Sequence, residues 1–557
     1  MKKKPLFIAF NAVFKSVLLF SLSLFLIFSL SDCSKRKSGE QPVLDSTYVT
    51  TYMNSKPAFA DDLYWAMEFY KQRSYQLGWF KEHELVPQAG KMLKAVSRAG
   101  EEGLDPAAYQ VVKVDSLVKE LKKIKRDLDK RDELEKQIDL ALSATYFNWA
   151  TDYYRGLLEP RETKQADWDV KRNRTKLHHA LMVVLGERES NLPYAEFQPM
   201  HPQYANLKKA LANYRKIKAE GGWPRIPEGA KVKPGESSDV AGLLRRRLSA
   251  FIPKDSLNTQ GSNNLYDQNL ASALRKFQEE NGLAVTGSLN AETIRFMNIP
   301  VDDRIRQVII NMERWRWIPQ SFERNYLIVN IPEFKLRVYE NGQEKMSMKV
   351  IVGKELNSTP IFSDVMEHIV LSPYWNIPPG ILKEEIAPKA ASNPGWLEAM
   401  DMEVITRDGS SPVDPSSVDW SAAGTNDFPY IVRRRPGPKN DLGDVKFMFP
   451  NSMNIYLHDT PASQLFSQSK RDFSHGCVRV ERPIELATYL LRNTGWDKSK
   501  IMNQISTRQE KYVPMKEKLP VYLVYFTAAA DENGKVKFYD DVYGHDKKLK
   551  GMYFSKL

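Results

Sequence analysis

The sequence predicts a multidomain α+β protein with a helical scaffold, a small three-helix domain, and an antiparallel β domain carrying an inserted capping subdomain. Apolar residues recur every three or four positions up to about residue 234, a short helical unit follows a Pro/Gly-rich linker, and the periodicity then changes to two. The chain has 557 residues, 42% hydrophobic and 11% aromatic, which suits three or four domains with filled cores. This composition, with only 2 Cys, excludes wholesale disorder and collagen-like or disulfide-rich architectures.

The N-terminus has the pattern of an export signal. Three lysines at 2–4 precede an apolar run over 16–30, which is short for a membrane helix of about 20 residues. The run ends just before Cys33, as in a lipoprotein signal whose Cys is acylated, although Asp32 departs from that pattern. An uncleaved membrane anchor is the alternative, and both place the protein in the cell envelope, on the periplasmic side. We therefore expect a signal peptide or membrane anchor over 1–33, lipidation at Cys33, and a tether over 34–50.

Residues 51–234 are predicted to form the helical scaffold domain, with apolar spacings such as Leu63, Met67 and Tyr70. The charged run over 119–139 mixes acids and bases, which is typical of a solvated helix face. The net charge of +12 is spread along the chain, and no basic block is interleaved with aromatic residues. We therefore expect no nucleic-acid partner.

A compact unit of three helices is predicted over 237–300. Asp267 is a candidate N-cap for the middle helix, and Asn281-Gly282 is a candidate stop. The segment from Tyr266 to Thr293 resembles the small three-helix peptidoglycan-binding domain. A helical spacer without affinity for glycan is the alternative interpretation.

A connector helix over 301–325 leads into the predicted catalytic domain over 326–530, where apolar residues alternate. Asn341-Gly342 is a strong hairpin signal. Further candidate strands are 369–371, 430–432, 445–449 and 454–457. The less regular stretch at about 380–438 is interpreted as an insertion over the β scaffold and a candidate lid, and 531–557 as a C-terminal tail.

The sharpest local feature is the run Ser474-His475-Gly476-Cys477-Val478-Arg479, which follows a second histidine at His458. A thiol becomes a useful nucleophile when an imidazole can take its proton, so Cys477 is a candidate nucleophile. The residues alone leave open a buried, inert Cys with structural histidines. A zinc site at His458, His475 and Cys477 is a further alternative, but the region lacks a C-x-x-C pair or an H-x-E partner, and we expect no metal.

His458-Asp459-Thr460-Pro461, followed 19 positions after the His by Cys477 within S-H-G-C-V-R, resembles the L,D-transpeptidase catalytic domain. The runs over 372–379 and 446–451 strengthen the resemblance, and the wider chain looks like the large members of that family. The resemblance implies that Cys477 is the nucleophile and His458 its general base. It also implies that the backbone carbonyl of Asp459, rather than its carboxylate, orients the imidazole.

The resemblance assigns supporting roles to the neighbouring residues. The backbone of Gly476 and Cys477, together with Tyr456, would face the oxyanion. Ser474 and His475 would shape the site, with proton transfer by His475 as an alternative. Arg479 would bind a substrate carboxylate or anchor the loop, and its fixed cationic fork suits both roles equally.

The function implied is cross-linking of peptidoglycan between the third residues of stem peptides, through a thioester on Cys477 and without a cofactor. The expected partners are stem peptides and glycan, the membrane through the N-terminal lipid or anchor, and carbapenem-type β-lactams as inhibitors that acylate the thiol. The alternatives are a non-catalytic peptidoglycan-binding envelope lipoprotein and an L,D-carboxypeptidase.

Overall fold

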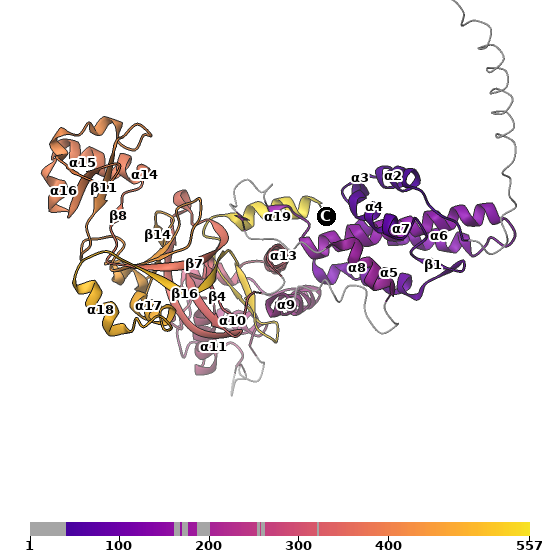
Figure 1. Ribbon diagram of the computed structural model, residues 1–557. Helices are drawn as coiled ribbons and strands as arrows, with labels where there is room; N and C mark the ends of the chain where they lie inside the picture. The colour runs from indigo at the N-terminus through magenta and orange to yellow at the C-terminus, as the bar shows by residue number, and fades with distance from the viewer. Residues whose placement is uncertain are drawn as a thin grey trace, which may run out of the picture. The chain divides into compact units, whose positions relative to one another are not determined.

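A computed structural model describes residues 41–160, 168–169, 176–186, 201–252, 257, 262–319 and 322–556 (Figure 1). The predicted leader, its lipidation site Cys33 and the first part of the tether lie outside these residues. Over the ranges described, no helix combines the length and apolar character needed to cross a bilayer. The chain divides into two compact units, one ending at Gly90 and resuming over Val112–Ala144, the other holding Lys91–Val111 and the chain from Thr145 onward. The predicted scaffold over 51–234 is therefore shared between two units.

The first unit is helical and centres on a buried carboxylate. Its helices include α2 (Ser46–Asn54), α3 (Pro57–Ala60), α4 (Leu63–Gln72), most of α6 (Val111–Leu121) and the first part of α7 (Leu128–Arg155), beside a hairpin of β1 (Phe80–Lys81) and β2 (Glu84–Leu85). Asp45 caps α2, so this helix begins inside the predicted tether. Asp139 accepts hydrogen bonds from the Tyr70 hydroxyl and from the N–H groups of Gly78 and Trp79. The charged run over 119–139 is mostly exposed as predicted, but Asp139 lies in the core.

The three-helix prediction for 237–300 is confirmed. Helices α10 (Asp239–Leu248), α11 (Gln268–Glu280) and α12 (Ala291–Met297) enclose one apolar core. Ser238, Asp267 and Asn290 each cap the following helix by accepting from the N–H three positions on.

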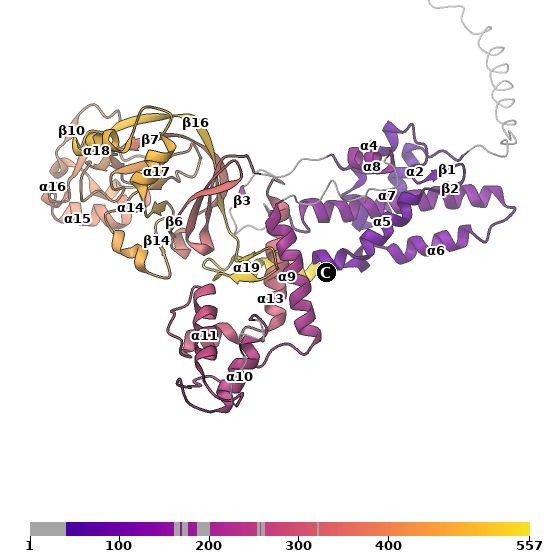
Figure 2. The same cartoon turned by 90° about the horizontal axis from the view of Figure 1, so that it is seen from below.

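Helix α13 (Val301–Trp317) is more than the predicted connector, because its side chains are buried on almost every face. It packs between α9 (Pro202–Ala219) and α19 (His545–Lys556), as Figure 2 shows. Arg314 pairs with Asp546 at 2.6 Å, and Arg316 pairs with Glu313 at 2.9 Å. The predicted tail over 531–557 is likewise folded: β18 (Val536–Phe538) pairs with β17 (Ala528–Ala530), and α19 follows.

The catalytic region is a closed barrel. Its strands are β4 (Tyr326–Asn330), β5 (Lys335–Glu340), β6 (Gln343–Gly353), β7 (Ile361–Leu371), β12 (Val445–Met448), β13 (Leu457–His458), β15 (Val478–Val480) and β16 (Lys511–Val524). The order β12-β13-β15-β6-β5-β4-β16-β7 closes because β12 also pairs with β7. Most pairs are antiparallel as predicted, but β4/β16 and β13/β15 are parallel. Asn341 and Gly342 form the predicted β5–β6 turn, both with positive φ.

The remaining barrel elements are short. Strand β14 (Asp472–Ser474) lies parallel to β6, and β3 (Trp168–Asp169) lies parallel to β7. Helices α17 (Pro483–Leu490) and α18 (Lys498–Ser506) lie between β15 and β16 in the chain.

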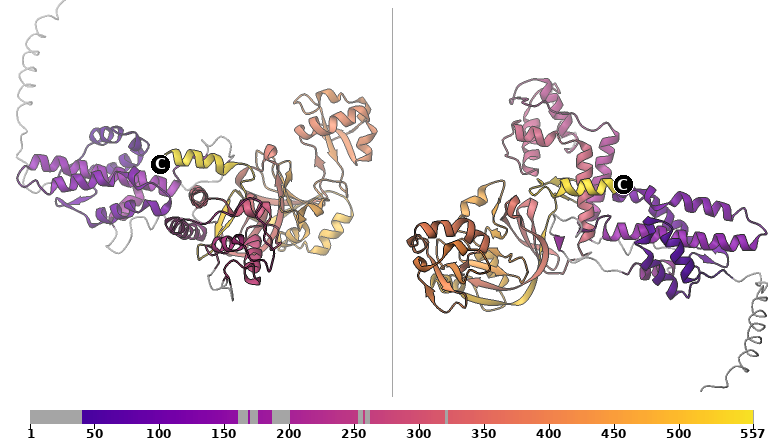
Figure 3. Two further views of the ribbon diagram at one scale, coloured as in Figure 1. Left: turned by 180° about the vertical axis from the view of Figure 1, so that it is seen from behind. Right: turned by 90° about the horizontal axis from the view of Figure 1, so that it is seen from above.

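The insertion is a small α/β subdomain with its own core, which we call the cap (Figure 3). It contains a four-stranded sheet in the order β10-β9-β11-β8 and a run of short helices. Its elements are β8 (Trp375–Asn376), α14 (Pro379–Ile381), η8 (Leu382–Ile386), α15 (Ala387–Ser392), α16 (Gly395–Ala399), β9 (Met402–Thr406), β10 (Pro412–Val413) and β11 (Tyr430–Arg434). The strand predicted at 430–432 therefore belongs to the cap sheet rather than to the barrel.

Candidate active site

Three neighbouring strands of the barrel present their polar side chains on one side. Lys446 on β12 lies opposite His458 on β13, and His458 lies opposite Arg479 on β15. Side chains two positions apart along a strand share a face, so Tyr456 and Cys477 lie on this side as well. The intervening residues point the other way and are buried in the barrel.

Tyr456, His458, Cys477 and Arg479 line a cleft of about 530 Å³ whose opposite wall is formed by the cap, whereas Lys446 lies outside the lining, with its Nζ 3.9 Å from the centre of the Tyr456 ring. Cys477 is partly exposed there, whereas His458 is only 4% exposed. The cap contributes Ile381, Glu385 and Trp396, among others. The predicted nucleophile and base therefore share one opening instead of pointing into separate interiors.

His458 is held as a neutral base. Its Nδ1 lies 2.5 Å from the backbone carbonyl of Asp459, which can only accept, so Nδ1 carries the proton and Nε2 keeps a lone pair. Burial, followed by the charge of Arg479, lowers the pKa of His458 to about 3. The imidazole is therefore uncharged at neutral pH.

Asp459 occupies the position that the family resemblance implies, with its carbonyl toward the imidazole. Its carboxylate accepts from the N–H groups of Asp444 and Thr460 at 2.9 and 2.7 Å. The side chain thus braces the turn that follows His458.

The direct neighbours of the thiol are not the ones expected. Burial raises the pKa of Cys477, while the backbone N–H and the phenol of Tyr456 and the charges of Lys446 and Arg479 lower it. The Sγ atom lies 3.7 Å from the carbonyl of Asn454. Within the described part of the chain, no hydrogen bond joins the thiol to His458. Such contacts often form only when substrate is bound.

Two hydrogen bonds of the Ser474 hydroxyl fix the turn before Cys477. The Ser474 hydroxyl donates to the Cys477 carbonyl at 2.6 Å and accepts the Gly476 N–H at 3.2 Å. The Gly476 N–H is therefore engaged by Ser474, and its role at the oxyanion stays a prediction. The Cys477 N–H has no partner among the residues that the structure describes, and it remains the candidate donor.

Tyr543 near the C-terminus and Thr359 before β7 also hold this turn in place. The Tyr543 hydroxyl donates to the Gly353 carbonyl at 2.8 Å, and the Thr359 hydroxyl donates to the Gly476 carbonyl at 2.7 Å. A Cβ on Gly353 would lie 3.0 Å from the Gly476 Cα and 2.0 Å from the Asn357 oxygen, so glycine is required where the two loops meet.

His475 and Arg479 have different surroundings. His475 Nε2 lies 2.9 Å from a carboxylate oxygen of Glu385, and it therefore bridges the nucleophile turn to the cap. Arg479 lines the cleft, and its Nε is buried without a hydrogen-bond partner. Arg479 makes no ion pair over the described ranges, so no ion pair supports the alternative that it anchors the loop.

The sequence interpretation missed three residues of this site. Lys446 is the first residue of the run over 446–451 that strengthens the family resemblance. The alternation along β12 could have placed it beside the histidine. Arg434, which pairs with Asp441 at the base of the cap, and Glu385 come from the insertion. No periodicity connects the insertion to Cys477.

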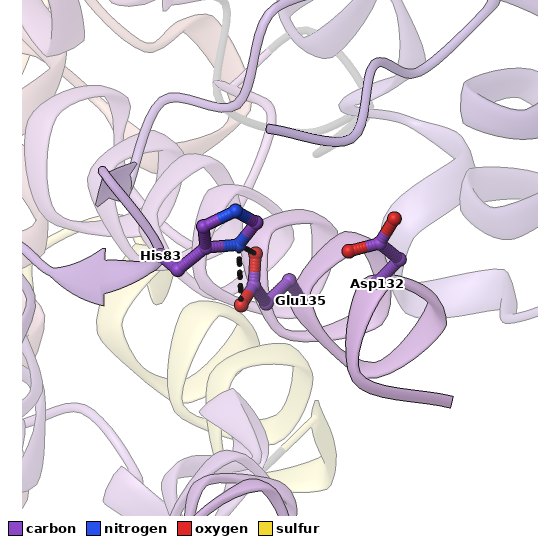
Figure 4. A group of neighbouring side chains, drawn as sticks. All are labelled: His83, Asp132 and Glu135. Carbon is purple, nitrogen blue, oxygen red and sulfur yellow. Dashed lines mark hydrogen bonds and ion pairs between the residues drawn. The ribbon is translucent and has the colours of Figure 1, made fainter. Parts of the chain in front are cut away.

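One cluster elsewhere in the described chain has the residue types of a metal site. Figure 4 shows His83 facing Glu135, with Asp132 one helical turn away. One carboxylate oxygen of Glu135 lies 3.0 Å from His83 Nδ1, and the other lies 3.0 Å from Arg131 Nε. The arginine compensates the buried carboxylate, and the cluster is explained as an ion-pair network.

Comparisons with known families cover most of the described chain. Residues 324–506 match the L,D-transpeptidase catalytic domain, 65–211 match a scaffold domain, and 241–297 match a peptidoglycan-binding domain.

Among curated proteins, a Haemophilus influenzae protein named as a candidate L,D-transpeptidase is 35% identical over 244 residues. The match covers 44% of this chain and 49% of that protein, so the chain spans about half the length of this relative.

Solved structures with local likeness include an L,D-transpeptidase from Xylanimonas cellulosilytica, at 15% identity, covering 54% of this chain and 100% of that chain with a TM-score of 0.17. L,D-transpeptidase 1 of Mycobacterium tuberculosis is similar at 12% identity, covering 36% and 61% with a TM-score of 0.14. At these TM-scores, the superpositions carry no argument about this site.

Proposed function

We propose that this chain, whose residues 324–506 match the L,D-transpeptidase catalytic domain, is an envelope acyltransferase that cross-links peptidoglycan stem peptides through Cys477. The observation that carries the proposal is the shared face of β12, β13 and β15, which brings a thiol and a neutral imidazole to one covered cleft. This arrangement suits acyl transfer by a cysteine nucleophile.

In the first half-reaction, His458 takes the proton of the Cys477 thiol, and the thiolate attacks the carbonyl that joins the third stem residue to terminal D-Ala. The Cys477 N–H donates to the oxyanion that forms. When the tetrahedral intermediate collapses, the C–N bond breaks and His458 returns the proton to the leaving amine of D-Ala. A thioester remains on Cys477.

In the second half-reaction, a side-chain amine from the third residue of a neighbouring stem attacks the thioester. The amine loses its proton to His458, the C–S bond breaks, and the thiol is restored. The product is a cross-link between third residues. Water as the acceptor would give a carboxypeptidase, and the cap across the cleft limits its entry.

The remaining parts of the chain fit an envelope enzyme. The three-helix domain would hold glycan near the catalytic barrel. Acylation of Cys33, or an uncleaved anchor, would keep the protein at the membrane on the periplasmic side. Carbapenem-type β-lactams would acylate Cys477, since their strained carbonyl takes the place of the scissile one.

The direct test is incubation of the full-length chain with disaccharide tetrapeptide, followed by mass spectrometry for dimers. Cys477→Ala should abolish dimers, whereas Cys33→Ala, which removes the other cysteine, should leave their rate unchanged. Equal dimer yield from Cys477→Ala would remove the proposal. Release of D-Ala without dimers would indicate a carboxypeptidase, and no product together with no carbapenem adduct on Cys477 would indicate a binding protein.

A further inference from the structure

We propose that the ammonium group of Lys446, which lies against the ring of Tyr456, holds the negative charge of the Cys477 thiolate, and that Lys446 is a positioning residue of the acyl-transfer site. This inference deepens the proposed function, because it rests on Cys477 being the nucleophile. It assigns the stabilisation of the thiolate, which forms when His458 takes the thiol proton, to a lysine instead of an imidazolium.

The strand register carries the first step. Lys446 lies directly opposite His458 in the β12–β13 pair, and Tyr456 is two residues before His458 on the same face. The Lys446 Nζ lies 3.9 Å from the centre of the Tyr456 ring. Tyr456 in turn neighbours Cys477 across β13 and β15, since Val478 donates its N–H to the Tyr456 carbonyl. The three side chains therefore form one contiguous row.

The second step is that Lys446 lacks an ordinary anionic partner. Two other barrel lysines pair with carboxylates, Lys349 with Glu481 and Lys518 with Glu367. Lys446 is half-buried and makes no ion pair over the ranges that the structure describes. Burial lowers its pKa, and the negative charge of Cys477, followed by that of Glu510, raises it again. Glu510 makes no ion pair with Lys446, and its carboxylate accepts the Tyr374 N–H at 2.8 Å. A thiolate in the cleft would compensate this ammonium group.

The third step is that the other groups facing the thiol cannot supply the same charge. His458 is neutral at pH 7, because its pKa is about 3. His475 is committed to Glu385 on the cap. Asp441 is an acidic residue that pairs with Arg434, and it supplies no positive charge to a thiolate.

Arg479 is the second cation at the thiol, and together with Lys446 it lowers the pKa of Cys477. Tyr456 adds its phenol and its backbone N–H. Its own pKa is raised by burial, so the phenol stays protonated and can donate. Once His458 has taken the S–H proton, these two cations and two donors favour the thiolate.

The experiment measures the reactivity of Cys477 directly. The full-length chain is alkylated with iodoacetamide between pH 5 and 10, and the rate at Cys477 is read from its peptide by mass spectrometry. We expect Lys446→Met to raise the inflection by about one pH unit, which is about tenfold less thiolate at pH 7. Lys446→Arg should keep the wild-type inflection, and all variants should reach the same plateau at high pH.

Lys345→Met is the matched control, because Lys345 is an exposed lysine on barrel strand β6 outside the cleft. An unchanged inflection in Lys446→Met would overturn the inference. If that variant fails to fold by circular dichroism, Lys446→Gln takes its place with the same expected shift and the same overturning result.

Alkylation does not require the natural substrate, so the two proposals fail separately. A shifted inflection without dimer formation would contradict the acyltransferase and leave the lysine inference standing. Dimer formation with an unshifted inflection would do the reverse.

Discussion

Two regions of this protein each hold a buried histidine beside an arginine, and they differ in what the arginine binds. His545 at the start of α19 lies next to Arg314, and His458 on β13 lies next to Arg479. Burial, followed by the neighbouring arginine, lowers the pKa of both, to about 4 and about 3. Arg314 has a carboxylate partner in Asp546, whereas Arg479 pairs with none over the described ranges.

The difference separates a structural cluster from a reactive one. Along α13 Arg314 and Arg316 pair with Asp546 and Glu313, so their charge is compensated within the fold. At the cleft, Lys446 and Arg479 make no ion pair over the described ranges, and the charges of both lower the pKa of the Cys477 thiol. A buried charge without a fixed partner is costly, and such groups cluster where substrate or a reacting atom supplies the partner. Substitutions should therefore change stability in the first region and reactivity in the second.

The largest expected effect is on the reactive side. His458→Gln removes the proposed base for the thiol proton, and we expect acylation of Cys477 by a carbapenem to slow by about 10²- to 10⁴-fold. The rate is measured by intact mass over time, and the melting temperature should stay close to wild type. Acylation within threefold of wild type would contradict the role of His458.

The next effect belongs to the structural side. Asp546→Asn breaks the pair with buried Arg314, and we expect a loss of about 3–5 kcal/mol in the free energy of unfolding, measured with urea. Glu532→Gln, at an exposed turn, is the control. The alkylation rate of Cys477 at low urea should be unchanged. A large change in that rate without a stability loss would reverse the assignment of the two regions.

Acidification should destabilise both regions at once. A histidine whose pKa is lower in the folded chain than in the unfolded chain contributes stability that is present above about pH 6.5 and is lost as the pH falls through the folded value. For His545, with a folded pKa of about 4, the loss is up to about 3 kcal/mol between pH 6.5 and pH 4. Urea unfolding of His545→Gln over this range should show a weaker pH dependence than wild type, while the exposed His179→Gln should not. Identical slopes for all three would contradict the burial argument.

The smallest effect concerns the cap. Glu385→Gln removes the contact with His475, and an exposed pair of this kind contributes up to about 1 kcal/mol, or about fivefold in the population of closed cap. We expect an increase of that size in the share of thioester lost to water, measured as free D-Ala relative to dimer. Glu384→Gln is the matched control, because Glu384 lines the same cleft without contacting His475. Equal effects in both variants would contradict a role of the Glu385–His475 contact in holding the cap closed.

Local signals in the sequence were informative where the structure is also local. Asn341-Gly342 predicts its hairpin because both residues accept positive φ. Asp267 predicts the start of α11 through a hydrogen bond three residues away. The sequence could not predict that α13 is buried on nearly all sides, because its arginines read as exposed residues until Glu313 and Asp546 compensate them.

The sequence by itself predicts the chemistry of the site, since the spacing of His458 and Cys477 and the glycine directly before Cys477 are properties of the chain. Only the tertiary structure decided which groups surround the sulfur. Strand register places Lys446 beside Tyr456. The Ser474 hydroxyl accepts the Gly476 N–H, and Glu385 of the cap contacts His475. Register and docking depend on hydrogen bonds and packing between distant segments, which no local pattern of residues records.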